Sequence, residues 1–95
     1  MDDIIAGRTA YFQVKIEPTP TDLQASQVVF RLLKEIVYIE EPAGSVISED
    51  TVSFTIDQGQ TDDLYEGIYI FEVIYTHEGN EDKVLDGTVN VLRRI

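Results

Sequence analysis

The sequence predicts an all-β fold, an antiparallel β-sandwich of six to seven strands. Apolar and polar residues alternate in several separate runs, which is the pattern of strands with one buried face. Turn-forming residues punctuate these runs at intervals of roughly eight to twelve residues, as in sandwiches, and helical periodicity is not convincing anywhere. A length of 95 residues, of which 43% are hydrophobic, suits one core. We therefore expect residues 1–95 to form a single domain.

The longest strand-like run extends from Thr61 to His77, and from Gly67 onward its residues are mostly β-branched or aromatic. Its first face carries Tyr69, Phe71, Val73 and Tyr75, which should point into the core. The spacing of Gly67, Tyr69 and Phe71 matches the Gly-x-Tyr-x-Cys step of strand F in immunoglobulin domains, with Phe in place of Cys. We therefore expect an immunoglobulin-like sandwich in which the Tyr69 hydroxyl bonds to backbone a few residues upstream.

Three other runs have a clear inward face. The predicted strands are Thr9 to Glu17, Gln27 to Leu33 and Thr51 to Asp57. Their inward residues are Phe12, Val14 and Ile16 in the first, Val28, Phe30 and Leu32 in the second, and Val52, Phe54 and Ile56 in the third. A fourth apolar run, Ile36 to Ile39, is a strand whose inward face the pattern leaves open, and the Ala43-Gly44-Ser45 segment after it has the composition of a loop.

The remaining segments are turns and one last strand. Gln58-Gly59-Gln60 predicts a turn, after which Thr61 is expected to cap a short helical turn. Glu78-Gly79-Asn80-Glu81 predicts a hairpin connection, because Gly and Asn tolerate positive φ. The last strand should run from Lys83 to Leu92, with Leu85, Val89 and Val91 inward and a bulge at Gly87.

Composition excludes several classes of partner. A formal net charge of −11 disfavours nucleic acid and anionic membranes, which are bound through Lys and Arg. The first residues lack the basic start and apolar run of a signal peptide, and no run approaches the length of a membrane helix. Cysteine is absent, so disulfides and thiolate chemistry are excluded.

Catalytic and metal motifs are also missing, and we expect neither an enzyme nor a cofactor. The only histidine, His77, falls at a strand end beside a turn, where it should be solvated. Acidic residues lie in predicted loops, where their pKa values should be ordinary. Asp62, Asp63 and Glu66 are close in sequence, but the spacing and glycine of an EF-hand loop are absent. We therefore expect no metal site.

The second face of the central strand is unusual for a sandwich. Ile68, Ile70 and Ile74 share it with Glu72, where polar residues normally face solvent. Val37 and Ile39, or their neighbours Ile36 and Tyr38, should extend this face on an adjacent strand. The candidate protein-interaction face therefore comprises Ile68, Ile70, Ile74, Val37 and Ile39. The alternative is that loops or the Ile4-Ile5 segment cover these side chains.

Several motifs together suggest a family. They are the opening Ile5-Ala6-Gly7-Arg8-Thr9-Ala10, the Thr21-Asp22-Leu23 step before a Val-x-Phe strand, the Leu64-x-x-Gly67-x-Tyr69 step and the ending from Val84 to Val91. The chain resembles the immunoglobulin-like domain of tailed-phage virion proteins and is similar to the N-terminal domain of siphophage upper baseplate proteins. Arg8 departs from this pattern, because an acidic residue is common there.

The resemblance implies a non-enzymatic structural or accessory protein of a bacteriophage virion, in the baseplate, tail or capsid. Its partners would be other virion proteins and further copies of itself, with no nucleic acid and no membrane. Its location would be the virion, after synthesis in the host cytoplasm. The alternative function is a ligand-binding or adhesion module of a bacterial surface protein, whose acidic loops would hold calcium or sugar.

Overall fold

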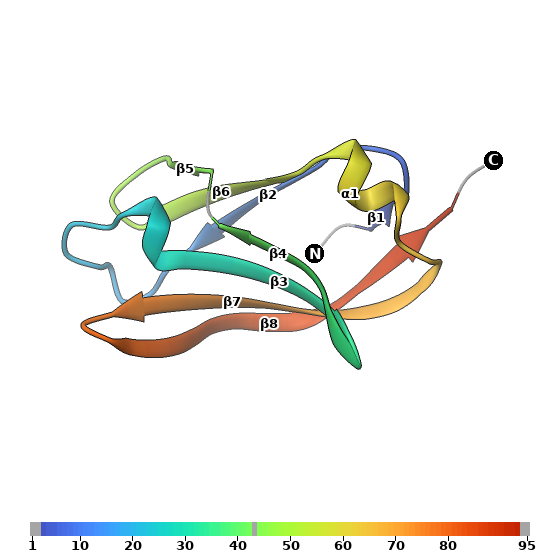
Figure 1. Ribbon diagram of the computed structural model, residues 1–95. Coiled ribbons are helices and arrows are strands. Elements are labelled where there is room, and N and C mark those ends of the chain that lie inside the picture. The colour runs from blue at the N-terminus through green and yellow to red at the C-terminus, as the bar shows by residue number, and fades with distance from the viewer. Residues whose placement is uncertain (1–2, 43, 94–95) are drawn as a thin grey trace.

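The computed structural model describes residues 3–42 and 44–93, and strands dominate it (Figure 1). The elements in chain order are β1 (Ile4–Ile5), β2 (Ala10–Lys15), a 3₁₀ helix (Ala25–Gln27), β3 (Val28–Lys34), β4 (Ile36–Pro42), β5 (Ser45–Val46), β6 (Thr51–Ile56), α1 (Gln58–Asp62), β7 (Gly67–His77) and β8 (Asn80–Leu92). The predicted all-β class is confirmed.

The strands form two sheets that face each other as a sandwich (Figure 1). A five-stranded sheet has the order β1-β8-β7-β3-β4, and a three-stranded sheet has the order β2-β6-β5. Every pairing is antiparallel except that of β1 with β8, which is parallel. The register between β7 and β8 runs from Gly67 opposite Val91 to His77 opposite Asn80.

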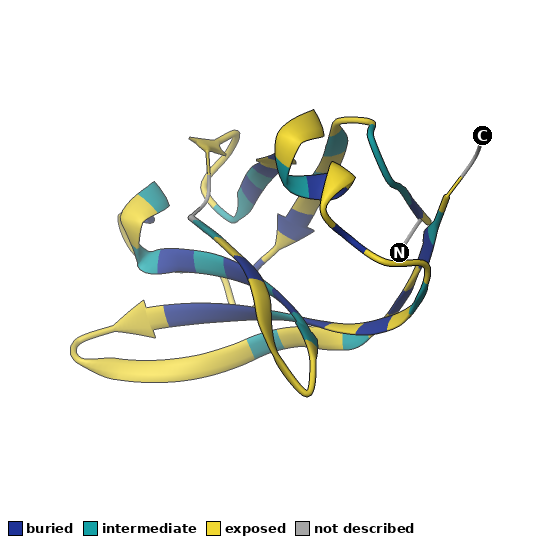
Figure 2. Ribbon diagram, turned by 45° about the vertical axis from the view of Figure 1, so that its right-hand side comes forward, coloured by how far each residue is buried: buried dark blue, intermediate teal, exposed yellow. Residues whose placement is uncertain are grey.

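The core lies between the sheets, and the inward faces predicted for β2, β3 and β6 are confirmed. Buried or partly buried residues alternate with more exposed ones along these strands, and Figure 2 colours the ribbon by burial. Phe30 is fully buried at the centre, where its ring lies 5.3, 5.8 and 6.2 Å from the rings of Phe12, Phe54 and Phe71. These aromatic contacts tie both sheets together, because Phe12 and Phe54 come from the smaller sheet and the other two from the larger.

Tyr69 fixes the approach to β7, and its expected upstream hydrogen bond is confirmed. Its hydroxyl donates to the backbone carbonyl of Tyr65 at 3.0 Å, while its ring is buried. The ring of Tyr38 meets it edge-on at 5.6 Å, and Lys34 Nζ lies 5.4 Å from its centroid. Burial raises the pKa of the Tyr69 hydroxyl above its ordinary value.

Two predictions for β8 were wrong. Leu85 is 43% exposed, although it pairs with the buried Val73 and so lies on the inward side of the sheet. The reason is its position on the outermost strand at this point, since among residues 3–42 and 44–93 β1 pairs with β8 only at Val91 and Leu92. The irregularity lies between Val73 and Ile74, not at Gly87.

Gly87 has a packing role instead of marking a bulge. It pairs directly with Phe71, and a Cβ atom built on it would lie 3.0 Å from Phe71 Cε1 and 3.1 Å from Cζ. These distances are shorter than ordinary carbon contacts, so a side chain at position 87 fits only if the Phe71 ring shifts by a few tenths of an ångström.

The segment after β6 also differs from the prediction. Gln58 to Gln60 form the first turn of α1 and not a loop, and the N-cap is Asp57 and not Thr61. Asp57 Oδ1 accepts from the Gln60 backbone N–H at 2.9 Å, and Gln60 Oε1 accepts from the Asp57 N–H at 3.1 Å. Thr61 lies inside the helix, where its buried hydroxyl donates to the Arg8 carbonyl at 2.8 Å.

Strands β1 and β5 were not predicted, so the described part of the chain contains eight strands where six to seven were expected. Both are two residues long, which is too short for an alternating pattern to show. Ile4 is nevertheless fully buried and belongs to the core. None of the helices in residues 3–42 and 44–93 is long and apolar enough to cross a membrane.

Candidate interaction surface

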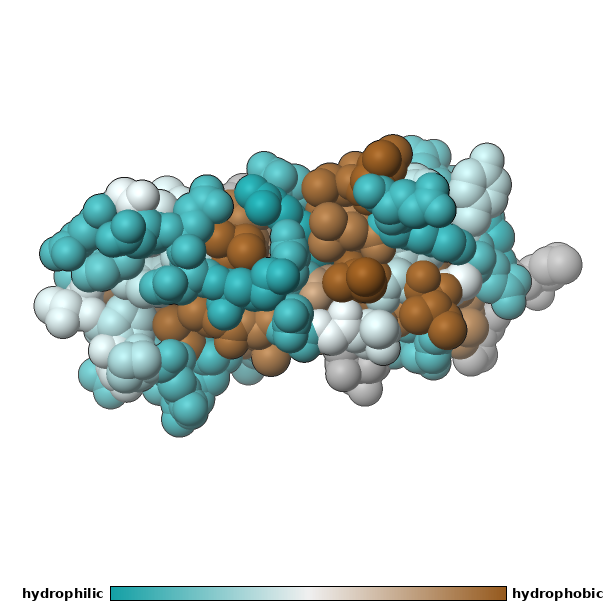
Figure 3. Space-filling model, turned by 90° about the horizontal axis from the view of Figure 1, so that it is seen from below, coloured by the Kyte–Doolittle hydropathy of each residue, from teal (hydrophilic) through white to brown (hydrophobic). Residues whose placement is uncertain are grey.

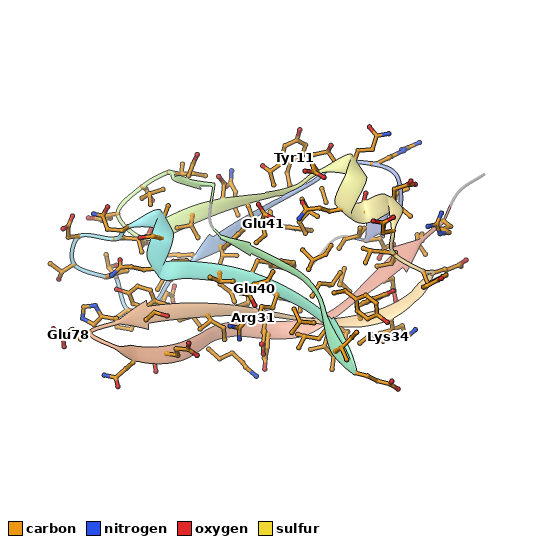
Figure 4. The ribbon with its side chains drawn as sticks, viewed as in Figure 1. Tyr11, Arg31, Lys34, Glu40, Glu41 and Glu78 are labelled. Atoms are coloured by element: carbon orange, nitrogen blue, oxygen red, sulfur yellow. The ribbon has the colours of Figure 1, made fainter. Side chains whose placement is uncertain are left out.

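The outer face of the five-stranded sheet is crossed by a row of charged side chains. Arg31 on β3 pairs in register with Glu40 on β4 and with Glu72 on β7, and Glu72 pairs with Asp86 on β8. Arg31 Nε lies 3.0 Å from Glu40 Oε2, and Lys83 Nζ lies 3.1 Å from Glu72 Oε2. Figure 4 shows Arg31 and Glu40 beside each other in this row. The charges are mutually paired, so they form a satisfied polar band.

Beside this band lies an apolar area that we call the outer patch, made of Leu33, Val37, Ile68 and Ile70. Leu33 pairs in register with Val37 on one side and with Ile70 on the other, so the three share one face. Ile68 lies two residues before Ile70 on the same strand and therefore on the same face. The exposed fractions of Ile68, Ile70 and Val37 are 65%, 54% and 45%.

The view of this side in Figure 3 shows apolar side chains gathered in separate areas with hydrophilic side chains between them. The predicted exposure of Ile68, Ile70 and Val37 therefore agrees with the structure. The alternative that Ile4 and Ile5 cover the face is wrong, because they pair with Val91 and Leu92 at the edge of the sheet.

Two residues of the predicted face are not exposed. Ile74 is buried, because it lies beyond the charged band, between its cross-strand neighbours Val29 and Lys83. Ile74 does not belong to the core cluster, so the prediction that it lies on the outer face of the sheet was correct. The prediction that it is exposed was wrong.

Ile39 is in the core and does not join Val37. The cause is a register shift on β4. Leu32 pairs with Ile39 whereas Leu33 pairs with Val37, so Tyr38 is an extra residue between them. Because Leu32 and Leu33 face opposite sides of the sheet, Val37 turns outward and Ile39 inward. A period of two cannot reveal such a shift, which is why the pattern left this strand ambiguous.

The acidic and histidine side chains do not converge on a site. Within residues 3–42 and 44–93, no group of three or more His, Asp or Glu is arranged to hold a metal ion. His77 is half-exposed at the end of β7, with Nδ1 at 3.4 Å from the Tyr75 hydroxyl. Asp50 accepts hydrogen bonds from the hydroxyls of Thr51 and Ser48, which lower the pKa of its carboxyl.

Comparison with protein-family models, with curated proteins and with solved structures gave no match.

Proposed function

We propose that this chain is a non-enzymatic structural or accessory module of a tailed-phage virion, working in the baseplate, tail or capsid through protein–protein assembly. The observation that carries the proposal is the outer patch, where Val37, Ile68 and Ile70 are about half exposed on one sheet face. Contiguous exposed apolar side chains on a soluble domain commonly mark an interaction surface.

Charge and patch have complementary roles in this proposal. A net charge of −11 keeps free subunits apart and soluble, because like-charged molecules repel. Burial of the outer patch against a partner then supplies the affinity, since apolar residues at the centre of an interface dominate its energy. The charged band with Arg31 and Glu72 would form the polar rim on one side.

The arrangement of strands supports the immunoglobulin-like part of the proposal. If β1 to β8 correspond to strands A′, B, C, C′, D, E, F and G, the observed orders read A′-G-F-C-C′ and B-E-D. That is the arrangement of immunoglobulin sandwiches, in which C, F and G share a sheet opposite B, E and D. The hydrogen bond from Tyr69 to Tyr65 has the position of a tyrosine corner, at the start of strand F.

The test compares two surface variants for incorporation into particles. Val37→Lys with Ile70→Lys places charge in the outer patch, whereas Tyr11→Lys does so at a residue of β2 that is 75% exposed on the smaller sheet (Figure 4). Ile74 is unsuitable for such a test because it is buried, and a charge there would destabilise the fold.

We expect both variants to fold and only the patch variant to lose co-sedimentation with particles from phage-producing cells. If both variants co-sediment like the unmodified protein, the outer patch is not the docking surface. If the unmodified protein itself stays in the supernatant, the virion assignment is wrong and a ligand-binding or adhesion module of a bacterial surface protein is favoured.

A further inference from the structure

A second surface lies at the end of the sandwich where β7 turns into β8. A groove of about 590 Å³ separates this hairpin from the loop that follows β2. Its lining includes Ile16, Pro18 and Pro20 from the loop side and Tyr75 and Val84 from the hairpin side. Ile16 and Tyr75 are buried and contribute apolar surface to the groove. Figure 1 shows the loop after β2 and the β7–β8 turn at the same end of the molecule.

The strand edge beside this groove is free. Among the residues that the structure describes, β8 pairs along its outer edge only with β1, at Val91 and Leu92. Asp82, Lys83 and Val84 belong to both the free edge and the groove lining. A backbone edge and a pocket are therefore adjacent, which is the arrangement used by proteins that bind a peptide as an additional strand.

The geometry of the hairpin identifies the backbone groups that point outward. Glu78 and Gly79 form its turn, with φ of 51° and 81°, and His77 pairs with Asn80. In a two-residue hairpin this closing pair is hydrogen-bonded, and bonding then alternates along the strand. Asn80 therefore bonds to β7, while the N–H and C=O of Glu81 face the free edge.

The acidic side chains near the free edge of β8 favour a basic binding partner. Glu81 and Asp82 lie on the free edge, and Glu17, whose carboxylate lies 3.6 Å from Lys15 Nζ, also lines the groove. Lys83 does not neutralise them, because its ammonium group already lies 3.1 Å from Glu72. A second copy of this chain would bring the same acidic edge and the same net charge of −11, so like charges would oppose pairing.

We propose that the hairpin half of β8 binds an extended, basic segment of a different protein as an additional β-strand. The segment alternates apolar residues with Lys or Arg. One apolar side chain enters the groove over Tyr75 and Val84, and the basic residues lie on the opposite face of the added strand, beside Glu81. This site is separate from the outer patch and does not depend on the proposed function.

The experiment titrates a fluorescein-labelled seven-residue peptide that alternates Lys or Arg with Val into the protein at near-physiological salt. Glu81→Pro removes the outward N–H without removing a bond to β7, and proline is tolerated at such edge positions. Glu81→Gln is the matched control, because it removes the same charge and keeps the N–H. Circular dichroism and thermal melting check that both variants fold.

We expect the unmodified protein to bind with a submillimolar Kd and Glu81→Pro to bind about tenfold more weakly than Glu81→Gln, the effect of losing one backbone hydrogen bond. Equal affinities of the two variants would mean that the backbone N–H of residue 81 does not contribute to binding, and this result would overturn the proposal. Absence of binding at about 1 mM peptide would do so as well.

A second measurement on the unmodified protein covers the case in which Glu81→Pro does not fold. In amide chemical-shift mapping, the peptide should perturb Glu81, Lys83 and the residues around Tyr75. A peptide that perturbs mainly Ile68 and Ile70 instead binds the outer patch, and the strand-addition site is then wrong.

Discussion

The contact between Gly87 and Phe71 gives the sharpest stability prediction. Gly87→Ala would place a methyl group 3.0 Å from Phe71 Cε1, on a ring that is buried and stacked on Phe30 at 6.2 Å. The ring cannot swing away freely, because Phe30 and the rest of the aromatic cluster hold its other side. The substitution should therefore strain the core, although it adds only one carbon.

The magnitude follows from two opposing effects. Overpacking a well-filled core typically costs about 1–3 kcal/mol. Alanine is intrinsically better than glycine in a strand by about 0.5–1 kcal/mol, because it loses less backbone entropy on folding. The net free energy of unfolding should therefore fall by up to about 2.5 kcal/mol, with a central value of about 1 kcal/mol.

A double-mutant cycle with Phe71→Leu isolates the contact. Leucine is smaller than phenylalanine and leaves room for the new methyl group. In that background Gly87→Ala should become neutral or stabilise by about 0.5–1 kcal/mol. Urea unfolding followed by circular dichroism measures all four proteins. Additive effects of the two substitutions would refute the reasoning, since the ring would then not be what excludes a side chain at position 87.

The remaining predictions concern Tyr69, Phe71 and Asp57. Tyr69→Phe should lower the free energy of unfolding by about 0.5–1.5 kcal/mol, because the hydrogen bond to the Tyr65 carbonyl is lost. Phe71→Ala should lower it by about 3–5 kcal/mol, because it leaves a cavity in the core. Equal, small losses for the two variants in urea unfolding would contradict these predictions. Burial raises the pKa of the Tyr69 hydroxyl in the folded protein. The contribution of this hydroxyl to the free energy of unfolding is therefore complete below the unfolded pKa, near 10, and is lost as the pH rises through the folded pKa. Tyr69→Phe should accordingly make the free energy of unfolding less dependent on pH in the alkaline range. Asp57→Ala should cost about 0.5–2 kcal/mol by removing the cap of α1, whereas an unchanged melting temperature would mean that the cap bond to Gln60 contributes nothing.

Strands with strict alternation were predictable because one face had to be buried. β2, β3 and β6 show this most clearly, and the inward set of β3, which includes Phe30, was identified correctly. The step from Gly67 to Phe71 also carried enough information to locate the Tyr69 hydrogen bond. In each case local spacing and tertiary packing agree, so sequence alone was sufficient.

The errors occurred where tertiary pairing decides the outcome. The register shift between β3 and β4 places Ile39 inward and Val37 outward, and it belongs to the pairing of the two strands, which the β4 sequence alone does not display. Leu85 has the pattern of a core residue but lies on an outermost strand that the smaller sheet leaves partly uncovered. Asp57 was overlooked as a cap because Gly59 in the following turn suggested a loop.

The sequence also could not show which isoleucines of the candidate surface are exposed, because the charged band that separates them comes from several strands. The pattern on β7 made Ile68, Ile70 and Ile74 equivalent, with Glu72 as a single interruption. In the sheet, Glu72 joins Arg31 and Lys83, and this band separates the exposed isoleucines from the buried one. Cross-strand partners therefore decide which residues of one face remain accessible.

The most direct test of the assembly proposal measures whether the outer patch becomes buried in the particle. The sequence contains no cysteine, so Ile70→Cys and Tyr11→Cys each supply a single thiol, one in the patch and one on the other sheet. Maleimide labelling rates are compared between the free protein and purified particles. We predict protection of at least about tenfold at position 70 on assembly and little change at position 11, as expected for a desolvated interface centre. Equal labelling of both positions in particles would contradict the account.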